Sequence, residues 1–597
     1  MKKQILLLLL GLCLLGAFAS CGGSKDDPPT DSDSGESGTT GGAETTGGTV
    51  DATTDILLWK KGEVTPVIVL PQNSKMMVKD MASALIEDVQ KELKLTMLTT
   101  TKESEALGRK ILVRMDAATA ESAQLGYSSY CYRLTESGDL EIVALTDLAA
   151  REGLKKLRTS LLYGEDRFSV SRSILGTKAL SKYDASVPYF SDHAKLYGLY
   201  DCGENDNYRV NFTGVTAAEY RAYEATLVAA GYEKKTENDI VGNLSAGYVK
   251  DKTLIWLNWS PSTTGLGITY GKKTYIPETS SFTEADRICE TTLTQIQLDG
   301  GGLCLVYQLG DGTFVIFDGG TTSPAETTGN LADRLLAFLQ EKKPEQHEKP
   351  IVAAWILTHG HEDHITAATD FFTRHNQAIE LRMAAFNFGD HSTDLFTPDD
   401  YGGGGLPVLI NKFRSALKSK FPLVPTMVVH TGQRFTLADV TFEVLNTHED
   451  TAAVYGYVNA LRSCNHACAA YRVTVGDTTA ILLGDTEVPS CKVMVKYYGD
   501  ALKSDILQAA HHGLNGATLE IYQAIDPDIV IWPCSDTWYA SDMNTGVASG
   551  YEFNKWIRDD SIKKRQHYTS SYRTEIKLPS LEVTKGEHDP SEDKPKT

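Results

Sequence analysis

Residues 351–364 read IVAAWILTHGHEDH, an apolar run that ends in a cluster of histidines and carboxylates. The apolar part, Ile351–Leu357, has the length and composition of a strand that is buried on both faces. The polar part begins where that strand ends. It holds three imidazoles and two carboxylates, which are His359, His361, His364, Glu362 and Asp363. A solvated polar loop is the plain alternative, but such loops rarely concentrate histidine so heavily.

Imidazole nitrogens and carboxylate oxygens are the ligands that hold zinc and related divalent ions in proteins. In an extended or turning segment, His359 and His361 project to the same side and can bind one ion. Asp363 and His364, at the start of a helix, can face a second ion nearby. The segment therefore predicts a centre for two divalent ions, with zinc as the expected metal.

His-x-His-x-Asp-His after an apolar strand resembles the metallo-β-lactamase superfamily of metallohydrolases. The resemblance spans roughly half of the chain, residues 289–581, and implies an α/β (α+β) fold with an αββα sandwich. The strands expected at 303–309 and 313–317 flank a turn and form a hairpin. That hairpin ends in Asp318-Gly319-Gly320, as the opening strands of the family's fold do. The resemblance thus places Asp318 behind the metal ligands, as a carboxylate that supports them.

Two later motifs supply the other ligands that the resemblance implies. Gly484-Asp485 follows a strand expected at 479–483, and in the family the aspartate here bridges the two ions, which need an anionic ligand between them. His511-His512-Gly513 is similar to the motif of DNA-uptake-channel hydrolase domains and phosphorylcholine esterases. One histidine should complete the second ion, and the other can contact the scissile group as a donor or acid. Adjacent side chains diverge, so we favour His511 as the ligand and retain both as candidates.

The third ligand of the first ion is open in the sequence. Residues 463–468 read SCNHAC, where relatives carry an Asn-Asn-x-Ser pattern and more typical members of the family carry a histidine. His466 is either a metal ligand or a hydrogen-bonding or surface residue. Cys464 and Cys468 are expected to be packed thiols or a disulfide rather than ligands.

The ligand set implies a hydrolase. Two zinc-like ions lower the pKa of a bridging water, and the resulting metal-bound hydroxide attacks a phosphorus or carbonyl centre. Asp363, His511 and His512 are the expected catalytic residues. The His-His-Gly motif favours phosphoric esters, either small molecules or glycan- or lipid-linked esters. The alternatives are a lactone, lactam or other ester hydrolase, and a surface lipoprotein that keeps the metal site only to bind ligands.

The N-terminus is expected to be a targeting segment. Lys2 and Lys3 precede an apolar run that ends in Phe18-Ala19-Ser20-Cys21, which resembles a bacterial lipobox with Cys21 as the lipidated residue. An ordinary signal peptide or a short anchor is the alternative. Ser24-Lys25-Asp26-Asp27 is similar to the export signal of surface lipoproteins in Bacteroidetes-like bacteria. Residues 22–54 are rich in Gly, Ser, Thr and Asp and predict a flexible tether. We therefore expect an envelope protein that a lipid anchors, most simply in the outer membrane.

Two small modules are expected between the tether and the sandwich. Residues 55–192 alternate strands and helices, with a final helix at 148–162, and resemble the α/β domain at the N-terminus of some glycoside hydrolases. Residues 195–280 predict an α+β module whose aromatic residues form either its core or a sugar-binding platform. Within the sandwich, strands at 426–429, 440–445 and 470–475 are expected in the second sheet. Residues 582–597 form a polar tail.

Composition limits the partners. The 597 residues exceed what one hydrophobic core supports, so about three domains are expected. The net charge of −20 disfavours broad binding to nucleic acid, whose phosphates it repels. The oligomeric state does not follow from the sequence.

Overall fold

The computed structural model describes residues 55–586 except 117, 120–123, 299–300, 322–330, 390–404, 456–462 and 541–550. The predicted signal segment, its Cys21 and the tether therefore lie outside the described residues, as does most of the predicted tail. Among the described helices, none is both long enough and apolar enough to cross a membrane.

Residues 55–192 form an α/β module with a mixed sheet in the order β3-β2-β4-β6-β5-β9. Strands β3, β2, β4 and β6 run parallel, and β5 joins β6 in an antiparallel hairpin. A smaller sheet, β1-β8-β7, shares its core with helices α1 and α3. The elements are β1 (Asp55–Lys60), β2 (Val67–Val69), α1 (Met76–Leu93), β3 (Leu98–Thr100), β4 (Lys110–Arg114), β5 (Ser129–Leu134), β6 (Leu140–Ala144), α3 (Asp147–Arg158), β7 (Leu161–Tyr163), β8 (Arg167–Ser171) and β9 (Gly176–Ala179).

The final helix of this module is shorter than the sequence predicts. It ends at Arg158, and residues 161–163 form strand β7 instead of a last helical turn. Leu161 pairs with Val170 of β8, so pairing with a strand that follows in the chain replaces the helical hydrogen bonds there. An apolar run of this length fits either structure, and the later strand decides between them.

Residues 196–272 form an antiparallel sheet in the order β10-β11-β15-β14-β13-β12, with one helix, α4. Thr216 and Glu219 make a capping box that starts α4. The aromatic residues considered for a platform are buried. Tyr232, Tyr248 and Trp259 belong to the core of the module, and Trp256 stacks on His430 of the sandwich. The elements are β10 (Leu196–Asp201), β11 (Tyr208–Phe212), α4 (Ala217–Ala229), β12 (Glu233–Ile240), β13 (Asn243–Lys250), β14 (Thr253–Ser260) and β15 (Gly265–Lys272).

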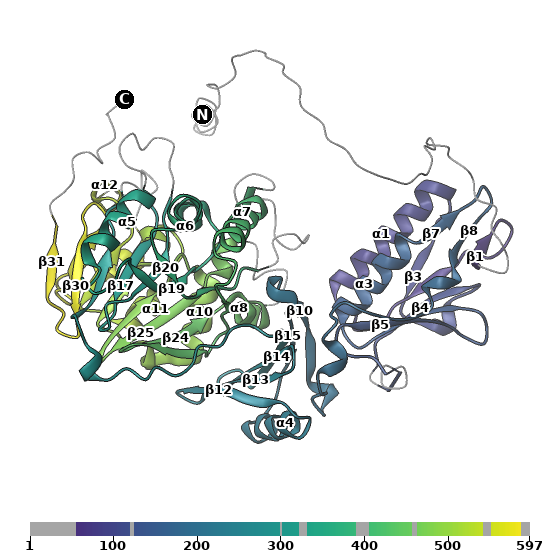
Figure 1. The fold of residues 1–597 in the computed structure, drawn as a ribbon. Coiled ribbons are helices and arrows are strands. Elements are labelled where there is room, and N and C mark those ends of the chain that lie inside the picture. The colour runs from purple at the N-terminus through teal and green to yellow at the C-terminus, as the bar shows by residue number, and fades with distance from the viewer. Residues whose placement is uncertain are drawn as a thin grey trace, which may run out of the picture. The chain divides into compact units, whose positions relative to one another are not determined.

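The remaining described residues form the αββα sandwich that the sequence predicts, as Figure 1 shows. The first sheet runs β22-β21-β19-β18-β17-β16-β30-β31, with β20 beside β19. Its strands are β16 (Thr291–Gln295), β17 (Cys304–Gln308), β18 (Phe314–Asp318), β19 (Ile351–Ile356), β20 (Glu380–Leu381), β21 (Ala384–Phe386), β22 (Thr426–Val428), β30 (Thr574–Leu578) and β31 (Val583–Lys585).

The second sheet runs β23-β24-β25-β26-β27-β28-β29. Its strands are β23 (Arg434–Leu437), β24 (Val440–Asn446), β25 (Ala470–Val475), β26 (Thr478–Leu482), β27 (Ile506–Gln508), β28 (Ile529–Trp532) and β29 (Gln566–Thr569). The helices of the sandwich are α5 (Leu331–Lys342), α6 (Glu362–His375), α7 (Gly405–Lys420), α8 (His448–Tyr455), α10 (Val488–Tyr498), α11 (Leu519–Ile525), α12 (Asp536–Ala540) and α13 (Glu552–Ile557).

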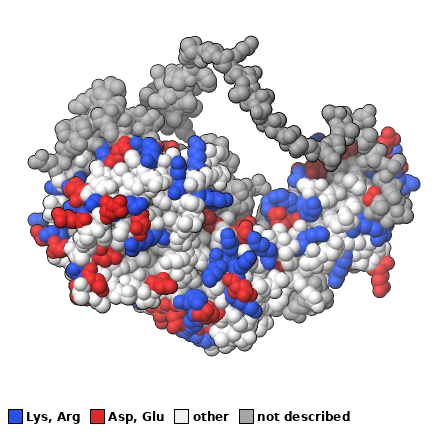
Figure 2. Space-filling model, in the orientation of Figure 1, with Lys and Arg blue, Asp and Glu red and all other residues white. Residues whose placement is uncertain are grey.

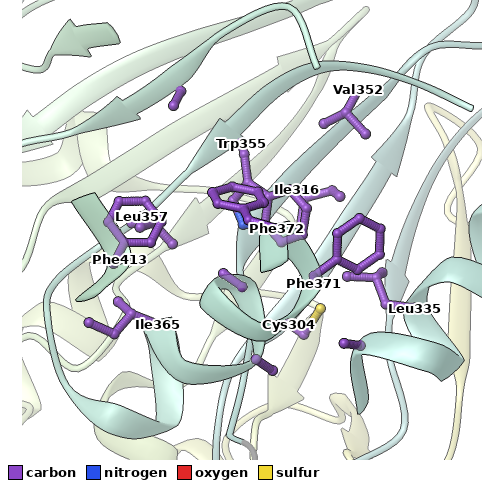
Figure 3. Close-up of a cluster of buried hydrophobic side chains, with 14 of the residues drawn as sticks. Cys304, Ile316, Leu335, Val352, Trp355, Leu357, Ile365, Phe371, Phe372 and Phe413 are labelled. Atoms are coloured by element: carbon purple, nitrogen blue, oxygen red, sulfur yellow. The ribbon is translucent and has the colours of Figure 1, made fainter. Parts of the chain in front are cut away.

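Three hydrophobic cores hold the four layers together. One lies between the two sheets, one joins α5, α6 and α7 to the first sheet, and one joins α10, α11 and α13 to the second. Along β19, Trp355 and Leu357 face the helices while Ile356 faces the second sheet, which is the alternation that a strand requires. Figure 3 shows Trp355 against Phe372 of α6, with ring centroids 4.9 Å apart.

The sequence analysis assigned one strand to the wrong sheet. Strand β22 was expected in the second sheet, but it pairs in parallel with β21 at the edge of the first. Helix α7 precedes β22 in the chain, and a helix is the usual connection between parallel strands. The pairing partner is far away in sequence, so the local pattern could not identify it.

The second module makes buried polar contacts with the sandwich. Arg209 of β11 donates from Nη2 to Oδ1 of Asp450 at 3.0 Å, and its Nη1 lies 3.7 Å from Oε2 of Glu449. Trp256 donates from its indole nitrogen to the carbonyl of Thr431 at 3.0 Å. Because these groups are buried, residues 196–272 and the sandwich stabilise each other.

The surface carries charges of both signs. Figure 2 shows acidic and basic side chains interspersed over the described part of the face turned to the viewer, with uncharged areas between them. The acidic excess of the sequence is therefore spread on this face rather than gathered in one patch.

Candidate metal centre

Four segments that are distant in sequence meet at one edge of the sandwich. Strand β18 ends at Asp318, and β19 leads into the loop that carries His359 and His361. The second sheet contributes the turns that follow β26 and β27. These two strands are parallel neighbours, so Asp485 and His512 emerge close together. The backbone N–H of His511 donates to the carbonyl of Gly484 at 3.0 Å and ties the two turns to each other.

His361 is the residue before the first turn of α6, so Glu362 and Asp363 occupy that turn. Carboxylates are favourable there because the helix N-terminus is electropositive. The buried face of α6 includes His364, Ala368 and Phe371, which lie at helical spacing. The same packing that buries Phe371 therefore points His364 inward.

Gly319 lets this helix approach the loop after β18. Its N–H donates to the carbonyl of His364 at 2.7 Å. A Cβ atom at Gly319 would lie 2.5 Å from the backbone nitrogen of Ala368, which is closer than real Cβ contacts. Glycine is therefore required for the close contact that holds Asp318 against His364.

The side chains form two groups of potential metal ligands. His359, His361 and Asp485 offer ligand atoms that all lie within 4.8 Å of one another, and so do Asp363, His364, Asp485 and His512. Asp485 belongs to both groups. This is the arrangement expected for a carboxylate shared by two neighbouring cations.

The donor atoms are spaced as ligands of one ion are. Nε2 of His359 lies 3.1 Å from Nδ1 of His361. Nε2 of His512 lies 3.0 Å from Oδ2 of Asp363 and 3.1 Å from Oδ2 of Asp485, and Nε2 of His364 is also 3.1 Å from that oxygen. Ligands about 2.1 Å from a tetrahedral zinc ion stand about 3.4 Å apart. The observed separations match that geometry.

Several of these atoms are buried without a satisfactory hydrogen bond. Within the described part of the chain, Nε2 of His364, Nε2 of His512 and Oδ1 of Asp485 have no hydrogen-bond partner. A buried polar atom left in this state costs about 1–3 kcal/mol. Divalent cations would use these atoms, and four imidazoles with two carboxylates suit zinc, iron or manganese. The residues present therefore fit a pair of divalent cations.

A second layer of hydrogen bonds fixes the orientation of two ligand rings. Nδ1 of His364 donates to Oδ2 of the buried Asp318 at 2.8 Å. Asp318 also accepts from the backbone N–H and the hydroxyl of Thr358 at 2.7 and 2.8 Å. Nδ1 of His512 donates to the carbonyl of Pro533 at 2.8 Å. In both rings Nδ1 therefore carries a proton, so Nε2 is the atom that would offer its lone pair to a bound cation.

The electrostatics show a site that attracts positive charge. Burial and the nearby rings of His364 and His361 hold the pKa of His359 well below its usual range, so this ring is neutral. Burial also disfavours charge on His512, yet Asp485 and Asp363 outweigh it and raise the pKa of His512 to about 10. The carboxylates thus draw protons onto the imidazoles, and bound cations would replace those protons.

The structure separates the two adjacent histidines. His512 joins the second ligand group, whereas His511, which the sequence analysis favoured, does not. Both residues have positive φ, +48° at His511 and +56° at His512, and their ring centroids lie 6.0 Å apart. Nδ1 of His511 donates to the carbonyl of Asn515 at 3.1 Å, and Nε2 lies 3.3 Å from Nδ2 of Asn465.

His466 also lies outside both ligand groups. Its Nε2 is 2.9 Å from Oε2 of Glu487, and Oε1 of Glu487 accepts from Nδ2 of Asn465 at 3.0 Å. His466, His511, Asn465 and Glu487 therefore make a separate polar cluster, which we call the Glu487 cluster. Cys464 and Cys468 are buried, and neither belongs to a ligand group. The first ligand group thus contains two histidines and the shared Asp485, without a third histidine.

Sequence reasoning missed Glu487 and Asn465. A carboxylate two residues after Asp485 was a usable signal, because the turn that presents one also presents the other. Asn465 was less visible, since its role depends on contacts with residues far along the chain. Its Oδ1 is buried without a hydrogen-bond partner among the described residues.

A family model covers most of the sandwich. Residues 298–533 match a family model described as "Metallo-beta-lactamase superfamily". No curated protein sequence matches the chain significantly. Similar solved structures include the metallo-beta-lactamase fold protein YhfI from Bacillus subtilis, at 14% identity over 50% of this chain and 100% of that one, with a TM-score of 0.27.

Two further structures are similar at the same level. CmlA, a diiron beta-hydroxylase from Streptomyces venezuelae, is 13% identical over 52% of this chain and 55% of that one, with a TM-score of 0.28. The short form of human tRNase Z is 10% identical over 40% of this chain and 92% of that one, with a TM-score of 0.24.

Proposed function

We propose that this chain is a metal-dependent hydrolase that acts on phosphoric esters through a centre of two divalent cations, with zinc as the expected metal. The observation that carries the proposal is the position of Asp485, which is common to two complementary groups of ligand atoms. Two bound cations would supply Lewis-acid polarisation of the ester and acidification of a water molecule. The residues of the chain then determine where the substrate and its protons are held.

Asp363 is the residue that we assign to water and proton handling. Its side chain is 26% exposed, whereas those of His364, His512 and Asp485 are at most 3% exposed. It therefore lies on the solvent side of the second ligand group. Its Oδ2 lies 3.0 Å from Nε2 of His512, and its Oδ1 can accept a hydrogen bond from an entering water.

The Glu487 cluster supports the choice of an ester that carries negative charge. His511 and His466 are partly exposed, at 22% and 13% of their side chains, and lie beside the turns that carry Asp485 and His512. Imidazole donors in this position can bind a phosphoryl oxygen or a leaving group. Lactones and other carboxylic esters remain the second candidate, because the same cation pair polarises a carbonyl oxygen.

A substrate screen tests this proposal. Purified protein reconstituted with zinc is assayed against phosphodiester, phosphomonoester and lactone chromogens. The same assays are run on Asp363→Asn and on the matched control Asp500→Asn, which changes an exposed carboxylate outside both ligand groups. We expect phosphoester turnover that falls about a thousandfold or more in Asp363→Asn and is unchanged in the control. Turnover of lactones alone rejects the substrate class. If the protein binds one of these esters but turns over none of them, the result supports the alternative that the chain only binds ligands at its metal site.

We also propose that the chain is a lipoprotein of the cell envelope, held through Cys21 with residues 22–54 as a tether. The support is the lipobox-like sequence and the composition of the segment after it. Its substrate would then be an ester near the membrane, including glycan- or lipid-linked esters, and no specific nucleic-acid partner is proposed. A Cys21→Ser variant should move to the soluble fraction, and unchanged retention in membranes rejects the anchor.

A further inference from the structure

The first module contains a crevice where its sheet topology predicts ligand binding. Strand β2 lies between β3 and β4, and all three run parallel. The chain leaves β2 through α1 toward β3 on one side, and it leaves β4 toward β5 and β6 on the other. The connections therefore diverge beyond the carboxyl ends of β2 and β4. In open α/β sheets, ligands bind at such a switch point.

A cavity of about 400 Å³ occupies this position. Its lining comes from the residues that end β2 and β4 and continue beyond them, 69–74 and 113–116, with Thr101, Glu103 and Asp147. The volume falls within the range of about 300–1,000 Å³ that is common for small-molecule sites. The sheet topology and the cavity are independent observations, and both point to the same crevice. The metal centre uses none of these residues.

The lining offers many hydrogen-bonding groups of both kinds. Gln72 and Asn73 carry amides, and both are exposed in the loop between β2 and α1. Helix α1 begins just after this loop, and the backbone N–H of its N-cap residue, Lys75, donates to Oδ1 of Asp147 at 3.2 Å. Asp116 supplies carboxylate oxygens at the opposite wall, beyond β4.

The basic side chains at the crevice already form ion pairs with carboxylates. Nη2 of Arg114 lies 2.7 Å from Oε2 of Glu103, and Nζ of Lys75, beside the crevice, is 3.6 Å from Oδ2 of Asp147. The described lining therefore presents no cation without a carboxylate partner, so an anionic ligand would have to compete with existing ion pairs. A neutral ligand with several hydroxyl groups can use the amides and the carboxylate without such competition.

The apolar part of the lining fits the same class of ligand. Pro71, Val113 and Met115 lie between the polar groups and can contact the C–H faces of a sugar ring. We propose that this crevice is a binding site for a neutral carbohydrate. The site is separate from the proposed hydrolase centre, and its existence does not depend on that activity.

Binding of glucose, galactose, mannose, N-acetylglucosamine and their β-linked disaccharides to the full chain tests the proposal, with titration calorimetry and saturation-transfer NMR as readouts. Two variants change the crevice, Asp116→Ala and Asn73→Trp, the second of which fills it. Asp80→Ala, an exposed carboxylate on α1 outside the lining, is the matched control. Thermal melting establishes that each variant is folded.

We expect at least one neutral sugar to bind, with affinity reduced about tenfold or more in both crevice variants and unchanged in the control. Failure of the whole panel to bind overturns the proposal, and so does binding that survives both variants. Tighter binding of glucuronate than of any neutral sugar rejects the neutral class. Ester turnover by the metal centre is measured in the same variants, and it should be unaffected by all of them.

Discussion

Replacing Asp318 with asparagine should weaken metal binding without unfolding the protein. Asp318 accepts three hydrogen bonds, two from Thr358 and one from Nδ1 of His364. Asparagine of nearly the same shape offers one oxygen and one NH2 group. If the NH2 group faced the backbone N–H of Thr358, two hydrogen-bond donors would point at each other, and neither of them can act as an acceptor. The oxygen therefore keeps that position, and NH2 faces His364.

The consequence is a change of tautomer in the ligand ring. Nδ1 of His364 can no longer donate to residue 318, so the proton moves to Nε2, the atom that a cation needs. Loss of such a supporting carboxylate typically weakens metal affinity by about 10- to 100-fold, or about 1.4–2.8 kcal/mol. Folding should survive because burial raises the pKa of Asp318 despite His364 and Thr358, and a neutral amide avoids the cost of that buried charge.

Competition between the protein and a chromogenic chelator for zinc measures this effect. Thr358→Val is the comparison variant. It removes the hydroxyl that contacts Asp318 and Nδ1 of His359, but it leaves the contact between Asp318 and His364 in place. We expect a small change in that variant and the larger loss in Asp318→Asn, with similar melting temperatures when the metal is absent. Wild-type zinc affinity in Asp318→Asn would refute the assigned role of the carboxylate.

Three further outcomes are expected. His512→Ala should lose about one bound cation per chain while His511→Ala keeps both, as elemental analysis will show; the reverse result rejects the assignment of His512. Gly319→Ala should lower the melting temperature by several degrees, because its Cβ would meet the backbone of Ala368, and an unchanged melting curve contradicts that contact. Burial opposes ionisation of Glu449, yet His430 and the neighbouring charges lower its pKa to about 2, so the stability it contributes is present above pH about 4.5 and is lost as the pH falls toward 2. Denaturant unfolding at several pH values should therefore show a shallower acid dependence in Glu449→Gln, and an identical dependence argues against this ionisation.

The sequence predicted those residues of the metal centre that directly follow a strand with a clear apolar pattern. The apolar run before His359 is long and ends abruptly, so both the strand and the position of the polar loop follow from local pattern. Asp485 was identified in the same way, at the end of another apolar strand. In each case a buried strand delivers a polar residue to the same edge of the sandwich, and the fold class is confirmed.

The features that the sequence could not settle depend on contacts between distant residues. The choice between His511 and His512 rests on two successive residues with positive φ, which no side-chain pattern announces. His466 is turned toward Glu487, whose place is set by the approach of α10 to residues 463–468. Strand β22 took a partner in the first sheet for the same kind of reason, since its pairing is settled by α7 and β21 and not by its own composition.

The number of divalent cations bound by the native chain tests the central claim most directly. The protein is reconstituted with zinc, freed of excess metal and measured by elemental analysis together with native mass spectrometry. Two ligand groups that share Asp485 predict close to two cations per chain, falling to fewer than one in Asp485→Asn, with the fold retained. A wild-type protein that binds no transition metal after reconstitution, or an Asp485→Asn variant that still holds two cations, would contradict the account.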